Sequence, residues 1–193
     1  MERTQQTPFS EAEMVKILEA AQQISREVYT FVLVMRFSGL RISDACTLKV
    51  SSLEGSHLVL RTVKTGSKVR VLLPDVVADA LRTIRAVSPT YFFWSGNGKL
   101  ASLTELWRSR RLKKVFEAAK VENAHPHRFR HTFATRLLQQ GVPVGMVATL
   151  LVNSERIVEK HYSAWIEARQ KGLDEAVQKA NGFHHLTPLM AQK

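Results

Sequence analysis

The stretch that most constrains the fold is His125 to Gly141, which reads HPHRFRHTFATRLLQQG. Phe129, Phe133 and Leu137 recur every four residues, so one face of a helix that begins near Pro126 is expected to enter a hydrophobic core. The same segment carries three histidines and three arginines. Four interpretations compete for this charge: a metal site, a solvated basic face, a nucleic-acid groove, and a pocket for one reacting phosphate.

Patterns elsewhere predict one mainly α-helical α+β domain with a small antiparallel sheet of two or three strands. Apolar spacing and the capping box SEAE predict helices over residues 10–23, 26–39, 74–87, 102–120, 142–152 and, as one or two helices, 154–180. Ser43 is a candidate cap of another short helix. HLVLRTVK, TGSK and VRVLLP predict a β-hairpin, with Lys64 at the tip of its first strand.

Charge and cysteine content narrow the function classes. Twenty-eight Lys and Arg against 17 Asp and Glu give a net charge of +11, which indicates a polyanionic partner such as nucleic acid. Cys46 is the only cysteine, so there is no intrachain disulfide framework or cysteine-based zinc site, and we expect it to be a small buried apolar residue. The chain contains no run of about 18 apolar residues and no targeting segment, which predicts an intracellular protein without membrane association.

Several residues outside the opening stretch can carry chemistry, although each also has an ordinary structural explanation. Arg41 in GLRISD has Asp44 one turn on, as an orienting carboxylate or a simple ion-pair partner. Lys64 lies at a hairpin turn, where lysines are usually just solvated. Tyr162 in VEKHYSAW has the setting of a half-buried packing residue.

Within the opening stretch, two histidine pairings lead to different sites. His127 and His131 are four residues apart, a workable metal-ligand spacing, but no carboxylate lies between Glu122 and Glu155 to complete a catalytic zinc site. His127 and Arg130 are three apart, so they project about 60° from each other and can converge on one anion. A guanidinium fork suits paired phosphate oxygens, and an imidazole can move a proton.

The order of these motifs resembles the catalytic domain of the tyrosine recombinases, also called the phage-integrase family. GLRISD, a hairpin lysine, HRFRHTFAT, a short helix and HYSAW follow one another between about Thr7 and Arg169. The resemblance implies a mostly α-helical domain with a small antiparallel sheet. It also implies that the protein cuts and rejoins DNA through a 3′-phosphotyrosyl intermediate.

The resemblance assigns a role to each candidate. Tyr162 is the nucleophile, and Arg41 with Arg130 supplies fixed positive charge where negative charge develops on the phosphate. A free tyrosine has a pKa of about 10, so His127 is expected to take its proton. Lys64 is expected to protonate the leaving 5′-oxygen. The bond energy is kept in the phosphotyrosine, so neither a metal nor any other cofactor is required.

Two departures from the family pattern carry expectations of their own. LLVNSE stands where the family commonly has L-G-H-S, so Val152 replaces the glycine and Asn153 a histidine or tryptophan. Loss of a charge-assisted contact costs roughly 1–3 kcal/mol, or about ten- to a hundredfold in rate, so we expect a weakened but functional site. We expect a linker remnant over 1–9, a catalytic domain over 10–180, a C-terminal tail over 181–193 and no N-terminal core-binding domain.

The expected partners are double-stranded DNA and further copies of the chain, with a tetramer as the assembled form. The expected location is the cytoplasm of a bacterial or phage system, at the nucleoid. Three alternatives remain: a DNA-binding module with impaired catalysis, strand passage like that of type IB topoisomerases, and a metal-dependent hydrolase built on the three histidines.

Overall fold

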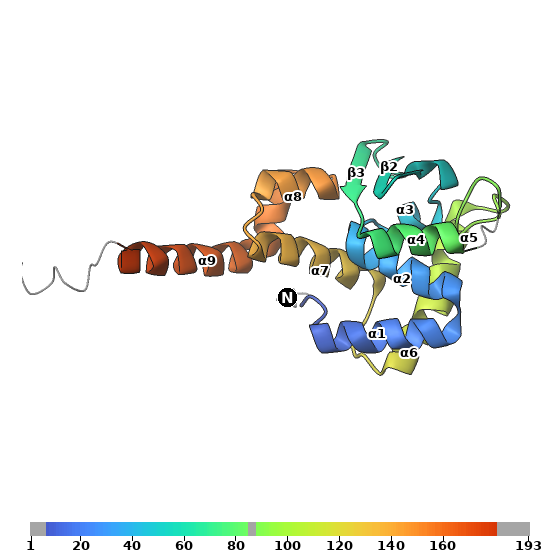
Figure 1. Cartoon of the computed structure of the whole chain (residues 1–193), viewed down its shortest axis with the longest axis horizontal. Coiled ribbons are helices and arrows are strands. Elements are labelled where there is room, and N and C mark those ends of the chain that lie inside the picture. Colours follow the sequence, from blue (N-terminus) through green and yellow to red (C-terminus); the bar gives the residue numbers. More distant parts are fainter. Residues whose placement is uncertain (1–6, 85–87, 181–193) are drawn as a thin grey trace, which may run out of the picture.

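The computed structural model describes residues 7–84 and 88–180 and has the predicted fold class, mainly helical with one small antiparallel sheet (Figure 1). Its elements, in chain order, are α1 (Glu11–Ile24), α2 (Arg26–Ser38), α3 (Ile42–Cys46), η1 (Val50–Ser52), β1 (Leu53–Glu54), β2 (His57–Arg61), β3 (Lys68–Leu72), α4 (Asp75–Thr83), α5 (Leu100–Leu106), η2 (Trp107–Leu112), α6 (Lys113–Ala119), α7 (Pro126–Gln139), α8 (Val144–Leu151) and α9 (Glu155–Ala180).

The first two helices follow from local signals at their ends. Ser10 and Glu13 form the predicted capping box, with reciprocal backbone-to-side-chain hydrogen bonds of 3.1 and 2.8 Å. Helix α2 ends at Gly39, whose φ of 62° is the left-handed conformation that glycine adopts freely. A Cβ at Gly39 would overlap the ring of Phe133, so this glycine also permits the close approach of α2 and α7.

The hairpin is confirmed, but its first strand is shorter than predicted. β2 ends at Arg61, and Lys64 lies within the turn that leads to β3 rather than at the strand tip. Beyond the Arg61–Lys68 pair, the Thr62 N–H donates across the hairpin to the Ser67 carbonyl at 3.0 Å, and the Thr62 hydroxyl lies 2.7 Å from that of Thr65 within the turn. β1 adds a third strand in the order β1-β2-β3, with all pairs antiparallel.

Three helix predictions need correction. α4 ends at Thr83 because Ile84 is extended (φ −73°, ψ 138°), and the rest of the expected helix, residues 85–87, lies outside the described residues. Ser43 does not cap α3: Arg41 holds the N-cap position, and Ser43 lies inside the helix. The helix expected over residues 102–120 begins at Leu100 and contains the π-helical segment η2 between α5 and α6.

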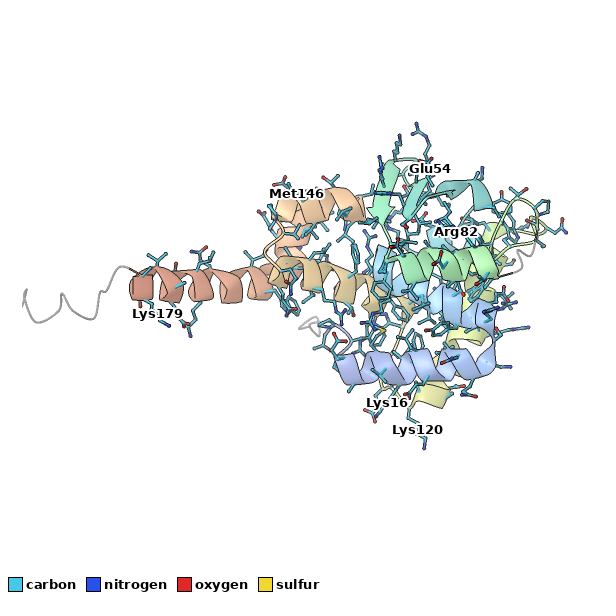
Figure 2. The ribbon with its side chains drawn as sticks, viewed as in Figure 1. Lys16, Glu54, Arg82, Lys120, Met146 and Lys179 are labelled. Carbon is cyan, nitrogen blue, oxygen red and sulfur yellow. The ribbon has the colours of Figure 1, made fainter. Side chains whose placement is uncertain are left out.

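Two hydrophobic clusters fill the structure. The larger gathers α1 to α6, the sheet and the start of α7 around residues such as Phe31, Trp107 and Phe129, and it includes the fully buried Cys46, as predicted. The smaller joins α7, α8 and the start of α9. Beyond that cluster α9 projects from the body, and Lys179 stands near its far end (Figure 2). No helix in the described ranges is long and apolar enough to cross a membrane.

Candidate active site

Arg130 is buried between the ends of two other helices. Helix α7 presents it toward Gly39, whose carbonyl accepts from Nη1 at 2.9 Å, and toward Leu151, whose carbonyl accepts from Nη2. Only 5% of Arg130 is exposed. Burial, and then the positive charge of Arg41, lower the pKa of Arg130 to about 10, so it remains a cation at neutral pH.

The hydrogen-bond donors of the Arg41 guanidinium are only partly used. Its Nη2 lies 3.4 Å from both the Val152 carbonyl and Oδ1 of Asn153, which are long hydrogen bonds. Its Nη1 is buried and has no hydrogen-bond partner within the part of the chain that the structure describes. An unpaired buried guanidinium nitrogen is costly, and an anionic ligand would satisfy it.

Asp44 does not form the ion pair with Arg41 that the sequence suggested as an alternative. Its Oδ1 accepts from the backbone N–H of Val63 at 2.7 Å instead, and so it holds the turn that carries Lys64. Burial raises the pKa of this carboxyl, while the Val63 hydrogen bond and the charges of Arg41 and Arg130 act in the opposite direction. Asp44 therefore influences the arginines through its charge and positions the lysine turn through its hydrogen bond.

Lys64, Arg41 and Asn153 line one cleft of about 560 Å³, together with Lys68. The cleft lies between the hairpin turn and the α8–α9 junction. Val152 ends α8 in the left-handed conformation (φ 49°, ψ 55°), and the Asn153 N–H donates to the Ala148 carbonyl at 2.9 Å. This helix end is what brings the Asn153 side chain to Arg41.

Tyr162 is docked within the small cluster rather than held away from the protein. It lies at a kink in α9, where φ is −125° and ψ is 15°, and only 4% of the residue is exposed. Its ring lies 5.4 Å from that of His131 and 6.0 Å from that of Trp165. Burial raises the pKa of Tyr162 to about 12, against the opposing charge of Arg130, so the phenol is protonated at neutral pH.

The two histidines of α7 link the tyrosine to the arginines. The rings of His127 and His131 meet edge to face at 4.7 Å, and His131 in turn contacts Tyr162. Partial removal from water, and then the charge of Arg130, lower the pKa of His127; burial lowers the pKa of His131 to about 4. Both imidazoles are therefore neutral at pH 7 and can accept a proton.

The structure thus gathers the predicted residues in two linked groups. Arg41, Lys64 and Asn153 share the cleft, and Arg130 reaches its edge through the Leu151 carbonyl next to Val152. His127 and Tyr162 meet through His131, a residue that sequence reasoning considered only as a metal ligand. Its four-residue spacing from His127 was the available signal.

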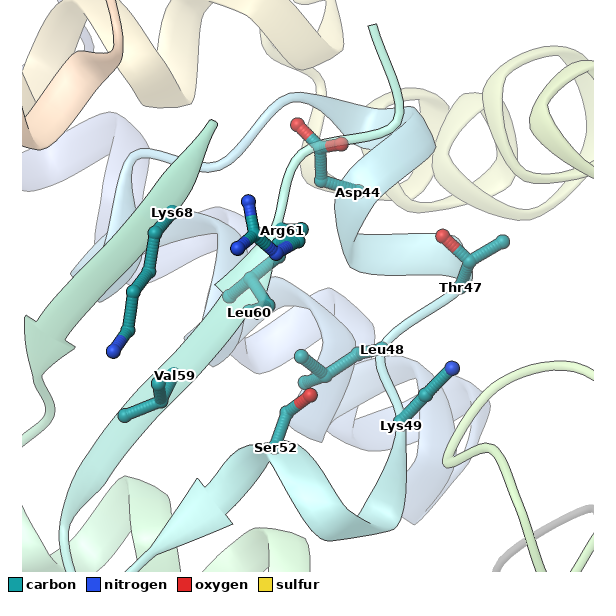
Figure 3. Close-up of a pocket in the computed structure, with 9 residues that line it drawn as sticks. All are labelled: Asp44, Thr47, Leu48, Lys49, Ser52, Val59, Leu60, Arg61 and Lys68. Atoms are coloured by element: carbon teal, nitrogen blue, oxygen red, sulfur yellow. The ribbon is translucent and has the colours of Figure 1, made fainter. Parts of the chain in front are cut away.

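Two other features are separate from this arrangement. A pocket of about 440 Å³ lies between α3, η1 and β2, and Asp44 is the predicted site residue that borders it (Figure 3). Within residues 7–84 and 88–180 there is no group of three or more His, Cys, Asp or Glu able to hold a metal ion. His127 and His131 consequently have no third ligand there, as a hydrolase centre would need.

A buried tyrosine beside His131 and within reach of the charge of Arg130, next to a cleft lined by Arg41 and Lys64, defines a site suited to nucleophilic attack on a phosphate. The phage integrase family model matches residues 8–164, and the chain belongs to this family. A tyrosine recombinase of Pseudothermotoga lettingae is 32% identical over 148 residues, which cover 74% of this chain and 51% of that protein. Tyrosine recombinase XerA of Pyrococcus furiosus is 28% identical over 186 residues, covering 92% of this chain and 63% of the relative. The chain therefore spans about half to two-thirds of these curated relatives.

Solved structures show the same fold. The catalytic domain of bacteriophage HP1 integrase superposes with a TM-score of 0.66 at 18% identity, covering 91% of this chain and 97% of that one. A XerA recombinase crystal structure gives a TM-score of 0.66 at 22% identity, covering 82% and 61% of the two chains. The predicted fold family is thereby confirmed.

Proposed function

We propose that the chain is the catalytic domain of a site-specific DNA recombinase or integrase that acts through a 3′-phosphotyrosyl intermediate. The observation that carries the proposal is the docking of Tyr162 against His131, with Arg130 close enough for its charge to act on the phenol. Membership of the phage integrase family supports it. Residues 10–180 would form the catalytic domain, with 1–9 as a linker and 181–193 as a tail.

In the proposed reaction the Tyr162 oxygen forms a bond to phosphorus and the bond from phosphorus to the 5′-oxygen breaks. With a pKa of about 12 the phenol must lose its proton as it attacks, and neutral His127 is the proposed acceptor, with His131 holding the phenol ring. Arg41, through its unpaired Nη1, and Arg130 would stabilise charge on the non-bridging oxygens. Lys64 would give its proton to the leaving 5′-oxygen, which departs as a free 5′-hydroxyl, and the second half-reaction reverses these transfers.

The proposed substrate is double-stranded DNA in the cytoplasm, at the nucleoid. The net charge of +11 suits a polyanion, and structural neighbours include a lambda integrase dimer bound to a core site and a XerH recombinase bound to its difH substrate. Recombination would require four copies on two duplexes. The energy of the phosphodiester is retained in the tyrosyl link, so we propose that no metal or other cofactor takes part.

A second function, DNA binding with impaired catalysis, is favoured by one observation. Asn153 offers Arg41 only a long neutral hydrogen bond at the position where the family commonly has His or Trp. A third possibility, relaxation of DNA as in type IB topoisomerases, would use the same residues of this site. It differs from recombination in that the cut strand is rejoined to its original partner.

The deciding experiment needs no knowledge of the target sequence. Supercoiled plasmid is incubated with the chain in EDTA at low salt, quenched with detergent and scored for relaxation and protein-linked DNA, beside Tyr162→Phe. Relaxation and an adduct that the Phe variant lacks are expected. DNA binding without either product would support the binding module, and activity that EDTA abolishes would indicate a metal-dependent hydrolase.

A further inference from the structure

Helix α7 carries polar residues on two different faces. At 100° per residue, His127, Arg130 and His131 occupy one face, and Arg128, Thr132 and Arg136 occupy another about 150° away. The first face carries the proposed chemistry. The second contacts the segment from Thr7 to Glu13, more than 110 residues away in the chain.

Arg128 is the centre of these contacts. Only 6% of it is exposed, and its guanidinium donates to the carbonyls of Thr7 at 3.0 Å and Pro8 at 3.2 Å, to that of Glu122 at 3.1 Å, and to both carboxylate oxygens of Glu13 at 3.1 Å. Its Cζ also lies 4.1 Å from the centre of the Phe9 ring. An arginine with this many buried partners allows its helix very little rotation or sliding.

Two further contacts extend the same attachment along α7. The Phe9 N–H donates to Oγ1 of Thr132 at 2.8 Å, and Arg136 pairs with Glu11, which also pairs with Arg36 at 3.5 Å. We call the contacts of Arg128, Thr132 and Arg136 with residues 7–13 the N-terminal clamp. Glu13 belongs both to this clamp and to the capping box that starts α1.

We propose that Arg128 is a positioning residue for the cleavage reaction: through the N-terminal clamp it fixes the rotation of α7, and so the placement of His127 and Arg130. The proposal rests on the proposed function for its effect on catalysis. Helix α7 also packs against α2, α8 and α9. The clamp adds polar contacts, centred on the buried Arg128, on the face that meets residues 7–13, and these fix the rotation of the helix more tightly than apolar packing does. Displacement of about 1 Å at a reacting group is enough to cost on the order of a hundredfold in rate.

The test compares Arg128→Gln, Arg128→Lys and Glu13→Gln with Arg111→Gln in the same chain. Arg111 is a matched control because it too joins two elements, through Glu27 at 2.6 Å and a cation–π contact with Trp107 at 4.6 Å, away from α7. The first readout is the pKa of His127, measured by a pH titration of its imidazole carbons in NMR. Burial, and then the charge of Arg128, lower the pKa of His125, so loss of that charge should raise it. The pKa of His125 therefore reports the charge of residue 128, and the pKa of His127 reports the position of α7.

We expect Arg128→Gln to move the pKa of His127 upward, toward 6.5, by about half a pH unit or more, and Glu13→Gln and Arg128→Lys to move it less. The rate of plasmid adduct formation should fall about tenfold or more in Arg128→Gln, while the plasmid concentration that gives half the maximal rate changes by no more than about twofold. In Arg128→Lys the rate should be partly restored. Arg111→Gln should lower the Tm comparably and change neither readout. The proposal would be overturned if the pKa of His127 were unchanged in Arg128→Gln. It would also be overturned if Arg111→Gln changed this pKa and the rate to the same extent.

Two features keep the test decisive. If Arg128→Gln does not fold, Arg128→Lys and Glu13→Gln supply the comparison, since each retains one side of the ion pair. If the unmodified chain forms no adduct, the proposed function fails on that result, while the His127 titration still decides whether Arg128 positions α7.

Discussion

The Asp44 carboxylate accepts a hydrogen bond of 2.7 Å from the backbone N–H of Val63, and this contact joins the helix that begins after Arg41 to the turn that carries Lys64. The other carboxylate oxygen is buried without a partner among the described residues. Arg41 and Lys64 are proposed to act on the same phosphate. Asp44 thus fixes their relative position without having to contact the phosphate itself.

Removal of this contact should release the lysine turn. Asp44→Ala leaves the Val63 N–H without its acceptor, so we expect a loss of about 1–3 kcal/mol in the free energy of unfolding by urea. Amide exchange at Val63, followed by NMR, should become faster. Asp44→Asn keeps an acceptor oxygen and serves as the control, with slower exchange at Val63 than in the alanine variant. Equal exchange in the unmodified and alanine proteins would show that the turn is held by other contacts.

Local sequence signals predicted the helices that frame the site. The capping box at Ser10 and the left-handed stop at Gly39 are encoded within a few residues of the helix ends they determine. Helix α7 follows in the same way from its apolar stripe and from Pro126 in the first turn. The role of Tyr162 came from family resemblance and its position was not predicted; the structure places it beside α7.

What the sequence did not reveal depends on contacts between distant segments. Asp44 was assigned to Arg41, one turn away, but its hydrogen-bond partner lies 19 residues along the chain. Arg128 was indistinguishable from a surface arginine, since its partners at Thr7 to Glu13 are more than 110 residues distant. The π-helical segment within the expected helix over residues 102–120 likewise had no sequence signal that we recognised.

The left-handed conformation of Val152 leads to a prediction about stability. A β-branched residue at φ 49° and ψ 55° is strained by about 1–2 kcal/mol, and glycine, the common family residue there, is not. In Val152→Gly, relief of this strain is expected to outweigh the lost packing and the larger unfolded-state entropy, for a net increase of about 0.5 kcal/mol in the free energy of unfolding. Val142→Gly, at a partly buried valine without a positive φ, should instead destabilise the protein. A comparable loss of stability in both variants would contradict the assignment of strain to Val152.

Buried His131 predicts how stability changes with pH. Burial lowers its pKa from 6.5 to about 4, so the unfolded state binds more protons than the folded state between these values. The free energy of unfolding should therefore fall as the pH is lowered from 6.5 to 4, with His131 contributing on the order of 3 kcal/mol over that interval. Urea denaturation at several pH values should show that the free energy of unfolding depends less steeply on pH in His131→Gln than in the unmodified chain. His57→Gln, at a histidine in the sheet, is the control, and an unchanged slope in His131→Gln would contradict the prediction.

Asn153 gives the prediction that bears most directly on catalysis. Its Oδ1 lies 3.4 Å from Nη2 of Arg41, so the side chain occupies a position from which an imidazole could donate a stronger hydrogen bond to a phosphate oxygen. We expect Asn153→His to raise the rate of adduct formation with supercoiled plasmid in EDTA by about tenfold, without tighter binding of the plasmid. Asn97→His adds the same side chain in an exposed loop that does not line the cleft and should leave the rate unchanged. A rate for Asn153→His equal to or below that of the unmodified chain would show that other residues of the cleft already compensate for the asparagine.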